Sequence, residues 1–342
     1  MSRTKFVLAM LAGAVAGLAA NPAAADGVVN IYSYREPGLF VPLLEAFTEE
    51  TGIQTQILNF SDGMLERVKA EGRNSPADIF LTTDIGRLVE LKDGGVTQPV
   101  RDEVLDEHIP PQYRDSDDEW FGLTMRARVV YASKDRVPDT EITYEDLADP
   151  KWRGRLCTRS GQHHYNIALF ASMIAHHGEE YTQNWLEGVK ANLAHPPTGN
   201  DRQQAQAIYA GECDIALGNT YYVGLMLTNE ENAEQKDWAA AIKILFPNAN
   251  DRGTHVNISG MAMAKNSPNP ENARKLMEFL ASPDAQAIYS NQVFEYPLSP
   301  NSTVNEIVKS FGTLIPDSLP LEEVAKYRDL ASELVDRVGF DN

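Results

Sequence analysis

The sequence predicts an α/β fold built as two lobes that face each other across a cleft. Segments with the apolar pattern of strands are followed by segments with apolar residues at helical spacing, and this alternation is typical of mainly parallel sheets flanked by helices. It stops near residue 132 and begins again at Arg155, which indicates a second unit of the same kind. A chain of 342 residues, 43% of them hydrophobic, is long enough for two cores.

The first series contains three strands, each followed by a helix. We expect the strands over 28–33, 54–60 and 78–81. The first helix ends at Gly52, and the third ends at the glycine pair 94–95. Ser61 is the expected N-cap of the second helix.

The second series follows a strand-like segment over 121–132. Four further segments have the pattern of strands and six have the spacing or the end signals of helices. The expected strands cover 155–158, 213–217, 241–246 and 255–264, and the expected helices cover 166–177, 202–210, 221–227, 270–281, 283–292 and 320–338.

The first 25 residues have the pattern of a cleavable secretory signal peptide. Arg3 and Lys5 precede an apolar run, and small residues close the segment at 23–25. Removing residues 1–25, which hold two basic and no acidic residues, changes the net charge from −19 to −21. We therefore expect an exported, soluble and acidic protein, and we exclude nucleic acid as a partner because a polyanion would be repelled.

Two cysteines, Cys157 and Cys213, remain in the exported chain. An even count in an oxidising compartment favours one disulfide of structural function, and the alternative is a pair of small buried hydrophobic residues.

Three tyrosines follow strands of the second series. Tyr221 and Tyr222 lie where a predicted strand ends and a helix begins, and Tyr165 occupies the matching place 56 residues earlier. Ligands of open α/β sheets bind at the carboxyl ends of strands, so the three phenols are expected to converge. Phenolates are hard, anionic donors, and only a highly charged ion such as Fe(III) would remove three protons near neutral pH. The alternative is half-buried tyrosines with solvated hydroxyls.

Arginines are the candidates for holding a small anion that completes the coordination of such an ion. Arg126 and Arg128 share one face of a predicted strand, and Arg35 follows the first strand. Surface salt bridging is the alternative, and we favour it for Arg128. His163 and His164 lack the spacing of a metal motif and are expected to be solvated loop residues.

The mature chain resembles the periplasmic ferric iron-binding proteins of ABC importers, which have a class II binding-protein fold and transferrin-like chemistry. The most specific segments are GECDIALGNTYY, RSGQHHYN and LTMRARVVYASKDRV. The resemblance implies that Tyr165, Tyr221 and Tyr222 are iron ligands and that Arg126 supports an anion. Many relatives have a histidine where this chain has Glu36, so the resemblance implies a shell completed by carbonate or another small anion, with Arg35 and Glu36 near it.

The same resemblance implies two lobes joined by two hinge strands. Lobe 1 comprises 26–127 and 256–302, and lobe 2 comprises 128–255 and 303–342. A non-enzymatic monomer is expected that delivers Fe(III) to an ABC permease in the inner membrane. The alternatives are a class II binding protein for an organic solute, such as a polyamine or thiamine, and an exported metal-dependent hydrolase that uses His163, His164 and Asp carboxylates.

Overall fold

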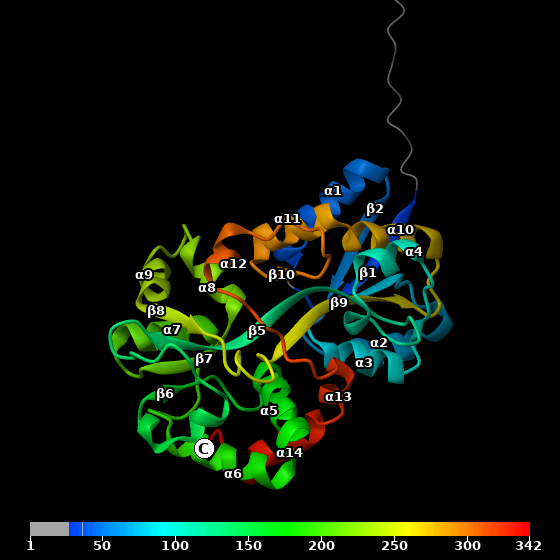
Figure 1. Cartoon of the computed structure of the whole chain (residues 1–342). Coiled ribbons are helices and arrows are strands. Elements are labelled where there is room, and N and C mark those ends of the chain that lie inside the picture. The colour runs from blue at the N-terminus through cyan, green and yellow to red at the C-terminus, as the bar shows by residue number, and fades with distance from the viewer. Residues whose placement is uncertain (1–26, 36) are drawn as a thin grey trace, which may run out of the picture.

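The computed structural model describes residues 27–35 and 37–342 of the chain (Figure 1). The predicted signal peptide, residues 1–25, and Glu36 lie outside the described residues. Within the described part, no helix combines the length and the apolar character that a membrane span requires.

Strands and helices alternate along most of the described chain. The strands are β1 (Val28–Ser33), β2 (Gln54–Asn59), β3 (Ile79–Thr82), β4 (Thr97–Gln98), β5 (Phe121–Ser133), β6 (Leu156–Cys157), β7 (Ile215–Asn219), β8 (Ile242–Leu245), β9 (Val256–Ala264) and β10 (Tyr296–Pro297). The helices are α1 (Val41–Thr51), α2 (Met64–Glu71), α3 (Ile85–Asp93), α4 (Glu103–His108), α5 (His164–His177), α6 (Glu179–Ala191), α7 (Asp201–Ala210), α8 (Thr220–Leu227), α9 (Glu234–Ala241), α10 (Pro270–Ala281), α11 (Pro283–Val293), α12 (Glu306–Ser310), α13 (Leu321–Ala325) and α14 (Arg328–Arg337).

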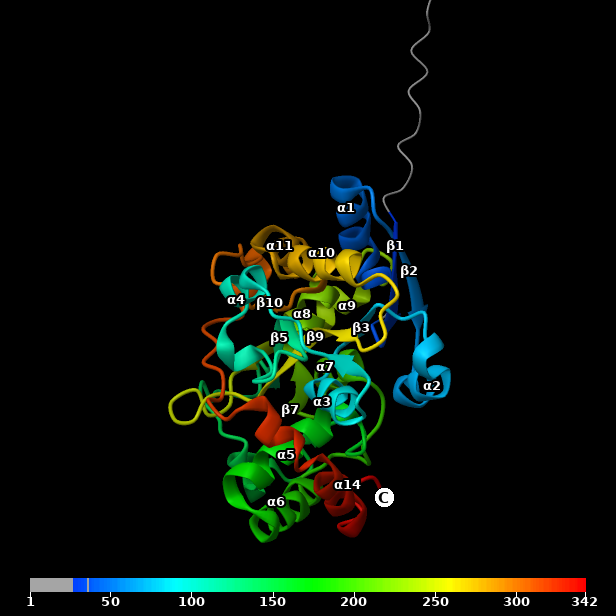
Figure 2. The same ribbon diagram turned by 90° about the vertical axis from the view of Figure 1, so that its right-hand side faces the viewer.

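Two long strands, β5 and β9, connect the two ends of the molecule. The strand order is β2-β1-β3-β9-β5-β7-β6, with β4 beside β9 and with β8 and β10 beside β5. Both views place α1, α10 and α11 at one end and α6 and α14 at the other (Figures 1 and 2). Because β5 pairs with β9 along one part and with β7 and β8 along another, it belongs to the sheets of both ends.

The pairing is parallel where strands are joined by crossover helices. β1 pairs in parallel with β2 and β3, and β6 pairs in parallel with β7. β5 and β9 instead pair antiparallel with their neighbours, so the expectation of mainly parallel sheets holds only in part. β5 and β9 run in opposite directions between the two ends, and each runs opposite to the parallel strand beside it.

Three large apolar clusters and a small one around Tyr221, Phe294 and Val308 fill the described part of the fold. One lies under α1, α10 and α11 and includes Phe47 and Leu276. A second, around α5, α6 and α14, includes Phe170 and Trp185. A third extends along β5 and β9 and includes Tyr131. Burial of these clusters is the main stabilising contribution to the fold.

Two predicted details were wrong. α2 begins at Met64 after Gly63, which has a left-handed φ of 74°, so Ser61 is not its N-cap. The amide of Met64 donates instead to the Tyr34 hydroxyl, at 3.0 Å. The predicted helix over 320–338 is divided into α13 and α14 at residues 326–327.

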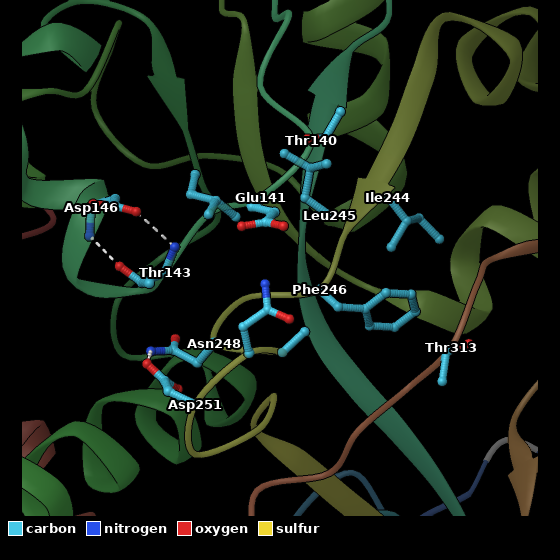
Figure 3. A pocket seen from close by; sticks show the side chains of 13 residues that line it. Thr140, Glu141, Thr143, Asp146, Ile244, Leu245, Phe246, Asn248, Asp251 and Thr313 are labelled. Carbon is cyan, nitrogen blue, oxygen red and sulfur yellow. Dashed lines mark hydrogen bonds between the residues drawn. The ribbon is translucent and has the colours of Figure 1, made fainter.

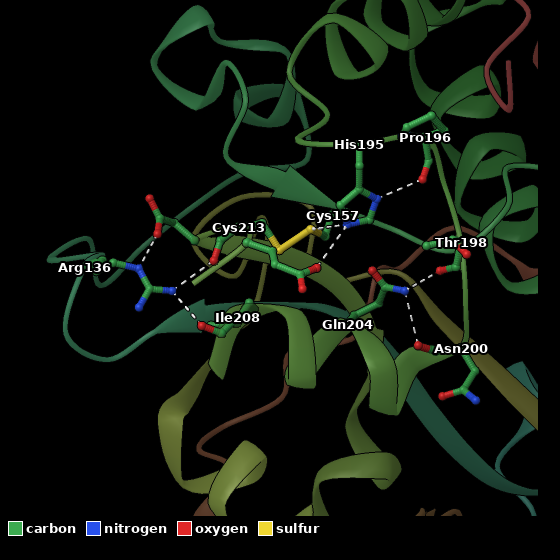
Figure 4. Close-up of a disulfide and its surroundings, with 11 residues drawn as sticks. Arg136, Cys157, His195, Pro196, Thr198, Asn200, Gln204, Ile208 and Cys213 are labelled. Carbon is green, nitrogen blue, oxygen red and sulfur yellow. Dashed lines mark hydrogen bonds and ion pairs between the residues drawn. A yellow bond between two sulfur atoms is a disulfide. The ribbon is translucent and has the colours of Figure 1, made fainter. Parts of the chain in front are cut away.

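Cys157 and Cys213 form a disulfide with 5.9 Å between their Cα atoms (Figure 4). Cys157 ends β6, and Cys213 lies two residues before β7. The His195 ring lies against the bridge, with Nε2 3.4 Å from the Cys157 sulfur. The bridge therefore joins the two parallel strands that lead to Tyr165 and Tyr221.

Candidate metal centre

Three phenols meet at the starts of two helices. Tyr165 is the second residue of α5, and Tyr221 and Tyr222 are the second and third residues of α8. The hydroxyls of Tyr165 and Tyr221 are 2.8 Å apart, and the ring centres of Tyr221 and Tyr222 are 4.2 Å apart. The structure thus brings together the three tyrosines that the sequence singles out.

The residues before Tyr221 fix the junction of β7 and α8. A side chain at Gly218 would overlap the ring of Tyr131, whose hydroxyl donates to the Asn219 carbonyl at 2.5 Å. The Thr220 hydroxyl accepts a hydrogen bond from the amide of Ala127 in β5, at 3.3 Å. These contacts fix the end of the strand against β5, and so they set the position of the tyrosine pair.

Burial makes two of the phenols hard to ionise when no metal is bound. Tyr221 is only 5% exposed. Its pKa is raised well above the ordinary value by burial and by the neighbouring phenols of Tyr165 and Tyr222. The pKa of Tyr222 is also raised, by burial and then by the charges of Tyr165 and Asp201. A cation bound here must therefore displace phenol protons.

Guanidinium groups surround these rings. Three of their central carbons lie near the centre of the Tyr165 ring, at 5.7 Å (Arg126), 5.8 Å (Arg128) and 5.3 Å (Arg159). The guanidinium of Arg202 lies 5.1 Å from the ring centre of Tyr222. The expectation that Arg126 and Arg128 share a face is confirmed, while sequence reasoning missed Arg159 and Arg202 because nothing local distinguishes them from surface arginines.

Arg128 is not the surface residue that we favoured from the sequence, since it is 2% exposed. It pairs with the fully buried Asp201 at 2.6 Å and donates to Asn166 and Asn219 at 2.8 and 3.2 Å. Asp201 also pairs with Arg159, at 3.2 Å. Because breaking a buried ion pair is costly, this cluster holds the helices that carry the tyrosines in fixed positions.

Arg126 has two buried donors without a hydrogen-bond partner in the described part of the chain, whereas Arg35, Arg128, Arg159 and Arg202 each have one. It is 2% exposed, and its Nη2 donates to the carbonyl of Thr83. Its Nε and Nη1 have no hydrogen-bond partner among the described residues. A small cavity lies beside this guanidinium and is lined by Tyr165, Asn219 and Asn257 among others. Two buried, unpaired N–H donors next to phenol ligands suit an anion.

Arg35 is occupied elsewhere. It is buried and pairs with the fully buried Glu295 at 3.1 Å. Burial lowers the pKa of Arg35, but attraction to Glu295 outweighs this effect and raises it. The other oxygen of Glu295 accepts hydrogen bonds from Thr124 in β5 and Ser259 in β9, at 2.5 and 3.0 Å. Glu295 thus links Arg35 to both long strands and engages two of its donors, while Nε of Arg35 has no partner among the described residues.

The two histidines beside Tyr165 are only partly solvated, and only His163 belongs to the loop, because α5 begins at His164. His163 is the N-cap of α5, and its Nδ1 accepts from the amide of Tyr165 at 3.2 Å. Burial lowers the pKa of His163 to about 2 and that of His164 to about 4, so both are neutral at physiological pH. Among the described residues, no three His, Cys, Asp or Glu side chains are grouped as metal ligands.

A larger cavity lies away from the tyrosines (Figure 3). Its lining includes Thr140, Glu141, Phe246 and Asp251, but no tyrosine or arginine. It offers none of the phenol donors that define the candidate centre.

The fold and the site define a solute-binding protein, and comparison with known proteins agrees. Residues 35–287 match the family described as bacterial extracellular solute-binding protein. Iron uptake protein A1 of Synechocystis sp. is 42% identical over 91% of this chain and 87% of its own length.

Solved structures narrow the assignment. The Bordetella ferric binding protein is 49% identical, covers 92% of this chain and 100% of its own, and superposes with a TM-score of 0.87. A Trichodesmium protein solved with iron and citrate ligands is 40% identical, with the same coverage and TM-score. The chain belongs to the bacterial extracellular solute-binding proteins, a non-enzymatic family, and within it to the ferric iron-binding periplasmic proteins.

Proposed function

We propose that this protein captures Fe(III) in the periplasm and delivers it to an ABC permease in the inner membrane. Iron is the transported substrate, and the phenolates of Tyr165, Tyr221 and Tyr222 are its ligands. The observation that carries the proposal is the convergence of these phenols, with 2.8 Å between two of their oxygens. The signal peptide over residues 1–25 would direct the chain, as a monomer, to that compartment.

The charges of the three phenolates suit a hard, trivalent ion, and the charge of Arg126 suits an accompanying anion. Three phenolates balance the charge of Fe(III) but leave part of an octahedral shell open. The unpaired donors of Arg126 would hold carbonate or another small anion in that part of the shell. Arg35, paired with Glu295, would support the site indirectly, and Glu36 would contact the anion or a metal-bound water.

Closure of two lobes around the ion is the second part of the proposal. Lobe 1 would comprise 26–127 and 256–302, and lobe 2 would comprise 128–255 and 303–342. The hinge would lie near Arg126–Val130 in β5 and Val256–Met261 in β9, because β5 ends its pairing with β9 at Ala127 and begins its pairing with β7 at Arg128. Hinge closure about such crossing strands is the usual motion of periplasmic binding proteins.

The alternatives find less support in the site. A polyamine or another organic cation needs unpaired carboxylates, whereas Asp201 is already paired with Arg128 and Arg159. A metal-dependent hydrolase using His163 and His164 needs a third ligand, and no such group exists among the described residues.

Titration of the purified protein with ferric citrate tests the proposal. A visible phenolate-to-iron charge-transfer band should appear, and it should weaken in Tyr221→Phe and in Tyr222→Phe. Tyr209→Phe is the matched control, because Tyr209 is 54% exposed on α7 and should leave the band unchanged. A colourless protein without iron in elemental analysis would refute the proposed function.

A further inference from the structure

The last residues of the chain contact the loop that leads to Tyr165. This loop, residues 158–163, connects β6 to α5. The Asp341 side chain accepts hydrogen bonds from the Gly161 amide and the Ser160 hydroxyl, both at 2.6 Å. It also accepts from the Gln162 amide, at 3.4 Å. A single carboxylate thus binds three consecutive residues of the loop.

Asp341 is itself held in place. Phe340 is fully buried, and its ring centre lies 5.6 Å from that of Phe170 in α5. The Lys190 ammonium in α6 donates to the carbonyls of Gly339 and Val338, at 2.5 and 3.1 Å. With the neighbouring residues anchored, the carboxylate makes its contacts at a reduced entropic cost.

The loop fits directly against this C-terminal segment. A Cβ atom at Gly161 would lie 2.7 Å from the Phe340 ring and 2.9 Å from Val335, so only glycine allows the close approach. The Gln162 side chain adds hydrogen bonds to α14, at 2.8 Å to Asp336 and 3.0 Å to the Ser332 carbonyl. The outer side of the loop is therefore fixed by α14 and the residues after it.

The inner side of the same loop is fixed by the arginine cluster. The side-chain NH₂ group of Asn166 donates to the carbonyls of Arg159 and Ser160, and its side-chain oxygen accepts from Arg128. His163 then caps α5 and accepts from the amide of Tyr165. The position of the Tyr165 phenol thus depends on a loop that is held from both sides.

We propose that Asp341 is a positioning residue for Tyr165 and sets how well this phenol can join the other two around the metal. The inference rests on the proposed iron-binding function. Asp341 never contacts the ion, and its effect passes through Ser160, Gly161 and the start of α5. Residues that hydrogen-bond directly to metal ligands typically change metal affinity by about 10- to 100-fold when they are altered, and we expect an effect near the lower end of this range through the loop.

Asp341→Asn tests the proposal. The substitution replaces one acceptor oxygen by an NH₂ group, which would face the hydrogen-bond donors of the loop. We expect Fe(III) affinity to fall by about tenfold or more, with a shifted charge-transfer band. Asp329→Asn removes the same charge from an exposed position of α14 and should leave both unchanged. The midpoint of thermal unfolding of the apo protein, measured for each variant, separates positioning from lost stability.

The outcomes separate this inference from the proposed function. A wild-type protein without an iron band would refute the proposed function itself. A wild-type band together with an Asp341→Asn affinity within about threefold of wild type would overturn only the positioning role. If Asp341→Asn does not fold, Ser160→Ala decides, because it removes one donor to the carboxylate and leaves the C-terminal segment intact. Unchanged affinity and band in that variant would overturn the inference.

Discussion

Fe(III) binding should release one proton for each phenol that becomes a ligand, and Tyr222→Phe should release one proton fewer than the wild-type protein. The pKa values of Tyr221 and Tyr222 are raised by burial, so these phenols carry their protons at neutral pH when no metal is bound. A metal binds only the deprotonated oxygen. Each phenol that becomes a ligand therefore loses its proton when the ion binds.

The size of the pH dependence of Fe(III) affinity follows from the number of phenols that lose a proton. With three protons displaced, the apparent affinity should change about 1000-fold per pH unit, and with two it should change about 100-fold. The sign is fixed by the raised pKa values, because affinity must fall as the pH falls below them. Any proton released by the accompanying anion contributes equally to both proteins, so the difference between them isolates the Tyr222 phenol.

Calorimetric titration gives the proton count directly. The ferric chelate is injected into protein in two buffers of different ionisation enthalpy at one pH. The slope of heat against that enthalpy is negative when protons are released, and its size is the number released. Chelate injected without protein supplies the correction, and Tyr209→Phe supplies the matched control. An identical proton count for wild type and Tyr222→Phe would contradict the ligand role of Tyr222.

The remaining predictions concern charge, the anion and the disulfide. Burial raises the pKa of Glu145, but hydrogen bonds from Asn248 and Arg252 outweigh it and hold the pKa at about 2. This depressed pKa contributes up to about 3 kcal/mol of stability above pH 4.5, which is lost as the pH falls towards 2. Glu145→Gln should therefore lower the urea midpoint at pH 7 but not at pH 2, and an equal loss at both would contradict the argument. Arg126→Gln should weaken iron binding about tenfold in bicarbonate and remove the dependence of affinity on added bicarbonate; a retained dependence would place the anion elsewhere. Intact mass should rise by two hydrogens after denaturation and reduction, and no change would mean that the disulfide does not form.

Local patterns were sufficient to predict most elements before the structure was known. Sequence patterns predicted several elements within a few residues, among them β1, β9 and the helix α5, which ends at His177. The reason is that apolar spacing and terminal glycines reflect short-range geometry. The residues of α6 and α9 were not assigned, and the division of 320–338 into two helices was missed. α6 has apolar residues at helical spacing, with Trp185, Leu186 and Val189 buried on one face, so its local signal was present and was overlooked. The break at residues 326–327 depends instead on packing against the rest of the fold.

The sequence likewise predicted one part of the candidate site, the tyrosines, but not the burial and pairing of its charged residues. Tyr165, Tyr221 and Tyr222 were identified from their places after strands, which follows from chain order and residue type alone. The buried state of Arg128 and the presence of Asp201 beside it were not predicted, because Asp201 is 73 residues away in sequence. A pairing of that kind has no local signal.

The sequence by itself determined the kind of fold, the three phenols and the acidic, exported character expected of the chain. Only the tertiary structure decided which charges are available at the site. It paired Arg35 with Glu295 and Arg128 with Asp201, and it left two donors of Arg126 without partners. It also brought Asp341 against the loop that leads to Tyr165. The physical reason is that burial and partner choice depend on long-range packing, whereas residue type and strand position are properties of the chain itself.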